Sequence, residues 1–276
     1  MTLRALAALA LLPACAPRIA PRAAMPMPRA APVIDRASRA AALQALAASV
    51  VGDEPAQRDR ARALGLVLRD AGGARTLTGE GAADDAVREA TVLTSLDSVG
   101  AVLVTSRCGN AWVVALRWDG AWRAGSVRAL VDGARPGACL LTSVRAEAAA
   151  ISTRALREIL VAWRAEAEDG DSERVTTFSA LRLDDAGRCD DLTGPVALGG
   201  EDDATGAARE GSWFVDDVLP PPRDVVLEVR PSRPGPGGQG VAQIERQVWR
   251  YAGARMVRVE SVTEPVAQRR GFAPPR

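Results

Sequence analysis

Apolar and polar residues alternate over short segments from about residue 87 onward, and this period of two constrains the fold more than any other feature of the sequence. The clearest segment puts four large apolar side chains on one face: Trp112, Val114, Leu116 and Trp118. Asp119-Gly120 follows, a dipeptide typical of two-residue hairpin turns. Such a turn places Arg117 opposite Trp122 on the returning strand, and we expect the guanidinium to stack on that indole. The sequence therefore predicts antiparallel hairpins.

Paired strands of this kind recur twice further along the chain. The segments 157–164 and 223–230 align with each other, and each is followed by a polar loop and a second strand. The second strands resemble one another in residues 115–118, 180–183 and 248–251. One more strand before each pair, at about 87–95, 138–148 and 211–218, and one after it give three related four-strand meanders. The likeness fits either internal duplication or the shared composition of strands.

The predicted fold class is mainly β, an antiparallel meander of about 12 strands preceded by one or two short N-terminal helices. Three four-strand units are too few to close a propeller of the usual four to eight blades. A sandwich, a partial barrel and propeller-like units all remain open. The helices would cover an edge or an open face of the sheet.

Two helical segments are expected before the strands. Asp35 is a suitable N-cap for the first helix, which ends at Gly52. Its apolar face would consist of Leu43, Leu46, Ala47 and Val50. The second helix begins at Asp53 and stops at Gly72-Gly73. Residues 64–68 also suit a hairpin strand that ends at the same glycines, so both alternatives stand.

The N-terminus carries an export signal. Met1–Arg4 is basic, and Ala5–Leu12 is an apolar run of signal-peptide length that is too short to span a bilayer. The run ends in Leu12-Pro13-Ala14-Cys15, which resembles the lipobox of bacterial lipoproteins. The resemblance implies that Cys15 carries a diacylglycerol and an acyl chain such as palmitate, and that Ala16 directs the protein to the outer membrane of a Gram-negative cell. Cleavage after Ala16 would instead release a soluble exported protein.

These observations divide the chain into five parts. Residues 1–14 are the signal peptide, and residues 15–34 are the lipidated cysteine and a tether rich in proline, alanine and arginine. Residues 35–73 are the helical segment, and residues 74–264 are the antiparallel β domain of three related four-strand units. Residues 265–276 are expected to be a disordered tail.

Residue types that many active sites require are missing from the sequence. It contains no histidine, and all 35 cationic residues are arginine. These absences exclude His-based catalysis, His metal ligands, and the Schiff-base and phosphate-loop chemistry of lysine. The formal net charge of +1 gives no sign of a nucleic-acid partner. We therefore expect no cofactor, no nucleic acid and no enzyme activity.

The remaining cysteines suggest one disulfide. In an alternating meander, the end of one unit's second strand and the start of the next unit's first strand lie at the same end of the sheet. This arrangement favours a bridge between Cys108 and Cys139 and leaves Cys189 free. The alternative is that all three thiols are reduced, because a bridge needs Cα atoms about 4.4 to 6.8 Å apart.

Carboxylates are the other candidates for chemistry. Adjacent acidic residues recur, but neighbours on a strand point to opposite faces, so most pairs are better interpreted as solvated turns. The loop 168–173 is the best calcium candidate, through Asp169, Asp171 and Glu173. It matches no EF-hand spacing, so no metal site is predicted.

The expected function is that of a membrane-anchored lipoprotein of the cell envelope, acting as a non-catalytic binding or scaffolding module. Its partners would be the lipid bilayer, through acylated Cys15, and another envelope protein bound at a sheet face or edge. The expected location is the outer membrane, facing either the periplasm or the surface. The alternatives are a carboxylate-dependent hydrolase of an envelope polysaccharide and a calcium-dependent adhesive domain.

Overall fold

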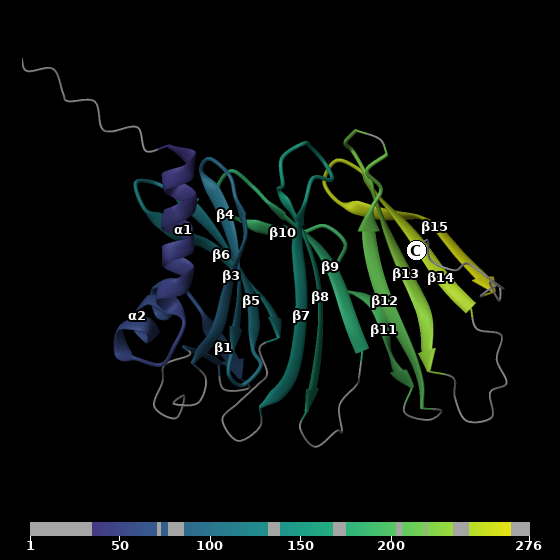
Figure 1. Cartoon of the computed structure of the whole chain (residues 1–276), viewed down its shortest axis with the longest axis horizontal. Helices are drawn as coiled ribbons and strands as arrows, with labels where there is room; N and C mark the ends of the chain where they lie inside the picture. Colours follow the sequence, from purple (N-terminus) through teal and green to yellow (C-terminus); the bar gives the residue numbers. More distant parts are fainter. Residues whose placement is uncertain are drawn as a thin grey trace, which may run out of the picture. The chain divides into compact units, whose positions relative to one another are not determined.

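The computed structural model describes residues 35–70, 73–76, 86–131, 139–167, 175–202, 206–218, 220–233 and 243–265. In these residues the chain forms two helices and fifteen strands (Figure 1). Thirteen strands form two antiparallel sheets, and two more form a separate hairpin. The prediction of a mainly β antiparallel meander with short N-terminal helices is confirmed. The segments predicted to be the signal peptide and the tether lie outside the described residues, as does the predicted tail except for Pro265, which ends β15.

The helices are α1 (Arg36–Val50) and α2 (Pro55–Ala63). Asp35 is the N-cap of α1, because its Oδ1 accepts the N–H of Ser38 at 2.7 Å. That hydrogen bond also lowers the pKa of Asp35. Within the described residues, no helix is long and apolar enough to cross a membrane.

Helix α2 ends well before the glycines that the sequence suggested as its stop. Gly65 has a φ of +74°, a conformation that favours glycine, and the N–H of Leu66 bonds the carbonyl of Ala61 at 3.3 Å. A paired hairpin then begins, with strands β1 (Val67–Asp70) and β2 (Gly73–Thr76). The helical interpretation of residues 64–70 was therefore wrong, and the hairpin alternative holds from Val67 onward but not for residues 64–66, which end α2 and lead into the strand.

Two antiparallel sheets form the body (Figure 1). The smaller sheet is a meander of β3 (Val87–Ser95), β4 (Val99–Ser106), β5 (Ala111–Trp118) and β6 (Trp122–Val131). The larger sheet has nine strands: β7 (Leu140–Ala149), β8 (Glu158–Ala167), β9 (Val175–Leu183), β10 (Cys189–Asp191), β11 (Val196–Asp202), β12 (Ala207–Val215), β13 (Asp224–Arg233), β14 (Gln243–Tyr251) and β15 (Met256–Pro265). Its order is β7-β8-β9-β11-β12-β13-β14-β15, and β10 also pairs with β9.

This order contains three four-strand meanders, namely β3–β6, then β7, β8, β9 and β11, and finally β12–β15. In each meander an arginine on the third strand lies opposite the first residue of the second strand. The pairs are Arg117 with Val99, Arg182 with Glu158, and Arg250 with Asp224. Because β11 pairs with β12 in one continuous sheet, the relation between the three four-strand units stays a prediction.

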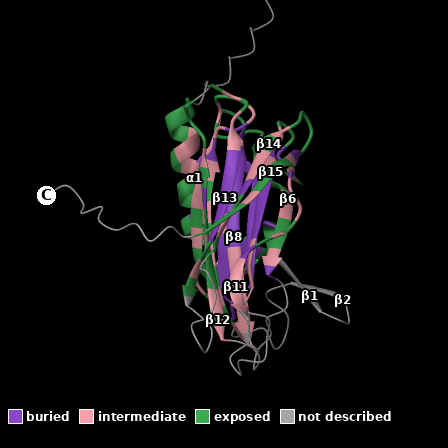
Figure 2. Ribbon diagram, turned by 90° about the vertical axis from the view of Figure 1, so that its right-hand side faces the viewer, coloured by how far each residue is buried: buried purple, intermediate pink, exposed green. Residues whose placement is uncertain are grey.

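The core lies in layers (Figures 1 and 2). Helix α1 covers one face of the smaller sheet, and the residues between them include Leu43, Ala47, Val50, Trp112, Val114 and Leu116. Between the two sheets lie Val99, Ala101, Val113, Ala115, Ile159, Val161, Leu181 and Leu183. The opposite face of β8 and β9 packs against β12–β15 through Leu160, Phe178, Ala180, Trp213, Leu227 and Met256. Strands β8 and β9 are therefore buried on both faces.

The larger sheet folds back on itself at β11. A bulge separates Ala197 from Gly199, which has a φ of +146°. On the next strand, a Cβ atom at Gly211 would lie 1.6 Å from the carbonyl oxygen of Leu198. The fold-back is closed further along by a bond from the N–H of Met256 to the carbonyl of Leu192 at 2.8 Å. The close approach of β12 to β11 therefore requires glycine at position 211.

The first hairpin differs from the expected one by one residue. Trp118 pairs with Trp122, and Arg117 pairs with Arg123, because the turn has three residues around Gly120. The prediction that Arg117 stacks on Trp122 was therefore wrong. The two indoles instead meet edge to face, with ring centroids 5.4 Å apart, and Nε1 of Trp122 donates to the carbonyl of Arg39 on α1 at 2.8 Å.

Substitution of Gly211 by alanine should destabilise the protein by about 3 kcal/mol, because β12 must move away from the Leu198 carbonyl. The measurement is the free energy of unfolding in urea. The matched control is Gly253→Ala, where φ is +82° but no atom lies within 4 Å of the added carbon, and the expected cost is about 1 kcal/mol. Equal losses in the two variants would contradict the role assigned to the fold-back.

Candidate functional site

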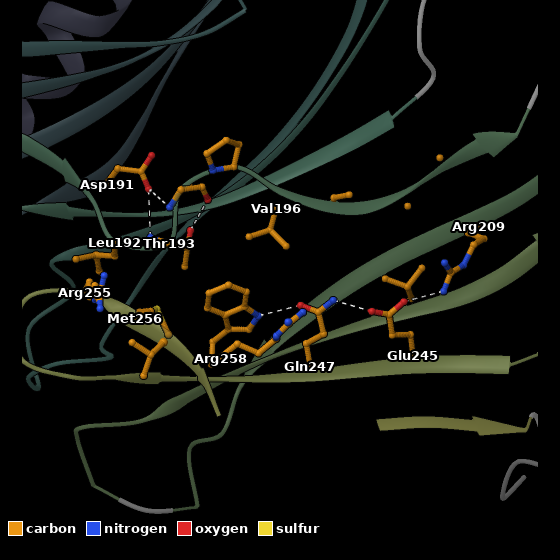
Figure 3. Close-up of a pocket in the computed structure, with 18 of the residues that line it drawn as sticks. Asp191, Leu192, Thr193, Val196, Arg209, Glu245, Gln247, Arg255, Met256 and Arg258 are labelled. Atoms are coloured by element: carbon orange, nitrogen blue, oxygen red, sulfur yellow. Dashed lines mark hydrogen bonds and ion pairs between the residues drawn. The ribbon is translucent and has the colours of Figure 1, made fainter. Parts of the chain in front are cut away.

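A groove of about 1170 Å³ lies on the inner side of the folded-back sheet (Figure 3). One wall is the segment 191–196 with the first part of β11, and the other is formed by β14 and the start of β15. The close-up shows side chains from both walls turned toward the space between them. The fold-back therefore brings together three segments that are far apart in the sequence.

The floor of the groove is a row of hydrogen-bonded side chains on β14. Residues 245, 247 and 249 point the same way because they alternate along the strand. Nε1 of Trp249 donates to Oε1 of Gln247 at 3.3 Å, and Nε2 of Gln247 donates to Oε1 of Glu245 at 2.7 Å. Arg209 on β12 completes the row through a 3.1 Å contact with Oε2 of Glu245. The polar atoms of the floor thus satisfy one another.

The acids of the groove are engaged in structural contacts. The hydrogen bond from Gln247 and the nearby guanidinium of Arg209 lower the pKa of Glu245, so this carboxylate is ionised at neutral pH. Asp191 accepts the N–H groups of Thr193 and Gly194 and contacts Arg128 at 2.9 Å. A glycosidase-type general acid needs a raised pKa, which is the opposite of what Glu245 has. The arrangement does not favour the hydrolase alternative.

The groove also offers groups that a ligand could contact. Its apolar lining includes Leu192, Pro195, Val196, Val229, Trp249 and Met256. At the rim, Arg255 and Arg258 are exposed and form no ion pair with any other residue that the structure describes. Apolar surface beside an aromatic ring and two available guanidinium groups is the combination found at binding surfaces.

The sequence did not identify this groove. A signal was present in β14, where Gln243, Glu245 and Gln247 occupy the same face as Trp249 and Tyr251, so that one half of this face is polar and the other half aromatic. That pattern gives no indication of the opposite wall, because residues 191–196 reach β14 only through the fold-back at β11.

The predicted site residues fall in two groups. The structure joins Cys108 to Cys139 in a disulfide, with Cα atoms 4.3 Å apart, and Cys189 is free. Cys15 and the calcium candidates Asp169, Asp171 and Glu173 lie outside the described residues. In the part of the chain that is described, no group of three or more acidic, cysteine or histidine residues could hold a metal ion.

Burial raises the pKa of Cys189 to about 12, and the neighbouring carboxylate of Asp190 adds to the effect. The thiolate fraction of Cys189 at neutral pH is therefore far below that of a free cysteine.

Nothing matches this chain among the protein-family models, the curated proteins or the solved structures with which it was compared. The functional argument therefore rests on the geometry of the chain itself.

Thiol labelling of a Cys15→Ser variant should report on all three remaining cysteines. Unfolded without reductant, the protein should take up one iodoacetamide label, and after reduction it should take up three, as counted by mass spectrometry. In the folded state at pH 8, Cys189 should react about 50-fold or more slowly than when unfolded, because its thiolate is scarce. Three labels before reduction would contradict the bridge.

Proposed function

We propose that this protein is a membrane-anchored lipoprotein of the cell envelope whose β body is a non-catalytic binding module, with the partner held in the groove between β11 and β14–β15. The observation that carries the proposal is that the groove contains two kinds of side chain. The polar groups of its floor satisfy one another, whereas the ring of Trp249 and the side chains of Arg255 and Arg258 are offered to a partner. Such a site can bind without performing chemistry.

A segment of another envelope protein is the partner that fits this groove best. The groove volume of about 1170 Å³ exceeds the usual range of about 300 to 1,000 Å³ for small-molecule pockets. Tryptophan and arginine are also the residue types that contribute most to protein–protein binding energy. The absence of histidine and lysine from the sequence supports a binding role over a catalytic one.

The anchor is proposed from the N-terminal sequence. The lipobox-like Leu12-Pro13-Ala14-Cys15 supports acylation of Cys15, and the proline-rich residues that follow support a tether between bilayer and body. Ala16 supports an outer-membrane location, on the periplasmic or the surface side.

Mass spectrometry of the mature protein should find an N-terminal Cys15 that carries a diacylglycerol and an amide-linked acyl chain. The protein should also partition into the detergent phase of a phase separation. A Cys15→Ser variant should lack the lipid and remain in the aqueous phase. An unmodified N-terminus elsewhere in the chain would overturn the anchor.

Photo-crosslinking in the native host tests the groove. A benzophenone side chain at Arg255, on the rim, should yield a protein adduct. The same side chain at Phe214 should yield no adduct. Phe214 is a suitable control because it is 48% exposed, and it lies on the outer face of the sheet because it alternates with Trp213, which faces the core. Trp249→Ala should reduce the rim adduct at least about fivefold, since the ring provides the largest apolar contact. An adduct of equal yield from Phe214, or one that does not depend on Trp249, would place binding elsewhere.

A further inference from the structure

Both walls of the groove are edges of strands. Met256, Val257 and Arg258 of β15 all line it, although adjacent side chains on a strand point to opposite faces. The opposite wall also consists of consecutive residues, from 191 to 197 (Figure 3). When every residue in a row borders one space, the main chain borders it too. The groove therefore presents main-chain groups as well as side chains.

The two edges are unpaired along most of the groove. Strand β15 is the last strand of the larger sheet and pairs only with β14. Strand β11 pairs with β12 only over residues 200–202, and among the described strands residues 196–197 pair with β9 alone. The N–H of Met256 joins the two walls through its 2.8 Å bond to the carbonyl of Leu192. The walls are thus bonded at one end of the groove and open beyond it.

The register shows which main-chain groups of β15 face the open side. Opposite residues of an antiparallel pair alternate between those that bond each other and those that turn their main-chain groups outward. The bond from the N–H of Ala252 to the carbonyl of Arg255, at 2.8 Å, sets the phase of this alternation. The outward-facing residues of β15 are those opposite the odd-numbered residues of β14, namely Met256, Arg258, Ser261, Thr263 and Pro265. The bond between Met256 and Leu192 is formed by one of these outward groups.

Two features of β15 restrict the strands that could pair with it. The extra residue Val259 forms a bulge, and bulges and charged side chains both limit edge-to-edge association. Pro265 occupies the last outward position, where the missing N–H removes no bond to β14. The outward groups of Arg258, Ser261 and Thr263 therefore form a short edge with a defined end, suited to a segment that matches it.

The charges at the groove favour an acidic segment. Two of the acids in the groove are already bound to arginines of β6 and β12. Arg255 and Arg258 lie on the β15 side and form no ion pair with any residue that the structure describes. Complementary charge selects between partners. The chain's own terminal segments, residues 1–34 and 266–276, contain arginine but no acidic residue, so they do not match.

We infer that an extended, acidic segment of the partner adds to the edge of β15 as a further strand, through main-chain hydrogen bonds with Arg258, Ser261 and Thr263. This inference rests on the proposed function, because it names the kind of segment that the groove holds. Alternate side chains of the added strand would point toward Trp249 and away from it. Main-chain pairing provides affinity, and the ring and the rim arginines select the side chains.

The test removes a main-chain donor and compares the result with removal of the side chain alone. Ser261→Pro deletes the N–H that faces the open side, whereas Ser261→Ala deletes only the hydroxyl. With the benzophenone side chain at Arg255 in the native host, the rim adduct should fall about tenfold or more in the proline variant. In the alanine variant it should stay within about twofold of the parent. Urea unfolding confirms that each variant is folded, and Thr263→Pro, which should have the same effect, replaces Ser261→Pro if that variant unfolds.

The adduct also identifies the bound segment. The peptide linked to position 255, sequenced by mass spectrometry, should contain Asp or Glu, and a synthetic copy should bind the full-length Cys15→Ser chain with a Kd that Ser261→Pro raises about tenfold. Undiminished adduct in a folded proline variant would overturn strand addition and leave the binding groove standing. A linked segment without acidic residues, or a linked second copy of this chain, would overturn the assigned occupant. Absence of any rim adduct in the parent would instead contradict the proposed function, and this inference with it.

Discussion

The burial of β8 and β9 on both faces is the interaction on which the rest of the structure depends. Ile159 and Val161 of β8 face the smaller sheet, while Leu160 between them faces the folded-back strands. A slip of one residue would exchange the two faces, so the register of the central strands is strongly specified. Glu158, at the first position of β8, is fully buried and accepts hydrogen bonds from the N–H of Ile151 and the hydroxyl of Ser152. Strands β8 and β9 therefore contribute to two cores, one between the two sheets and one between these strands and β12–β15.

The groove results from the fold-back at β11, which also encloses the core between β8–β9 and β12–β15. Along β14, Tyr251 and Trp249 are partly buried against that core, and further along the same face Gln247 and Glu245 replace apolar residues. The curvature of the sheet is continuous, but the chemistry of its inner face changes from apolar to polar. Strand β14 therefore begins as the polar floor of the groove and ends as a core strand.

Much of the fold could be predicted from local pattern, because alternation and turn residues act over a few positions. The shared face of Trp112, Val114 and Leu116 and the N-cap at Asp35 are examples. The three-residue turn at Gly120 was missed because Asp-Gly suits more than one loop length. The groove could not be predicted, since it is assembled from segments whose neighbours are set by the fold-back at β11.

The two faces of the β13–β14 pair explain how the groove keeps its geometry. On the outer face, burial alone would raise the pKa of Glu228, but hydrogen bonds from Arg246 and Arg230 outweigh it and lower the pKa. On the groove face, the pKa of Glu245 is lowered as well. Both carboxylates are therefore ionised at neutral pH, and each is bound to arginine on one of the two sides of β14. Charge-assisted contacts therefore hold β14 from both sides, and they fix the row of Glu245, Gln247 and Trp249 that forms the floor of the groove.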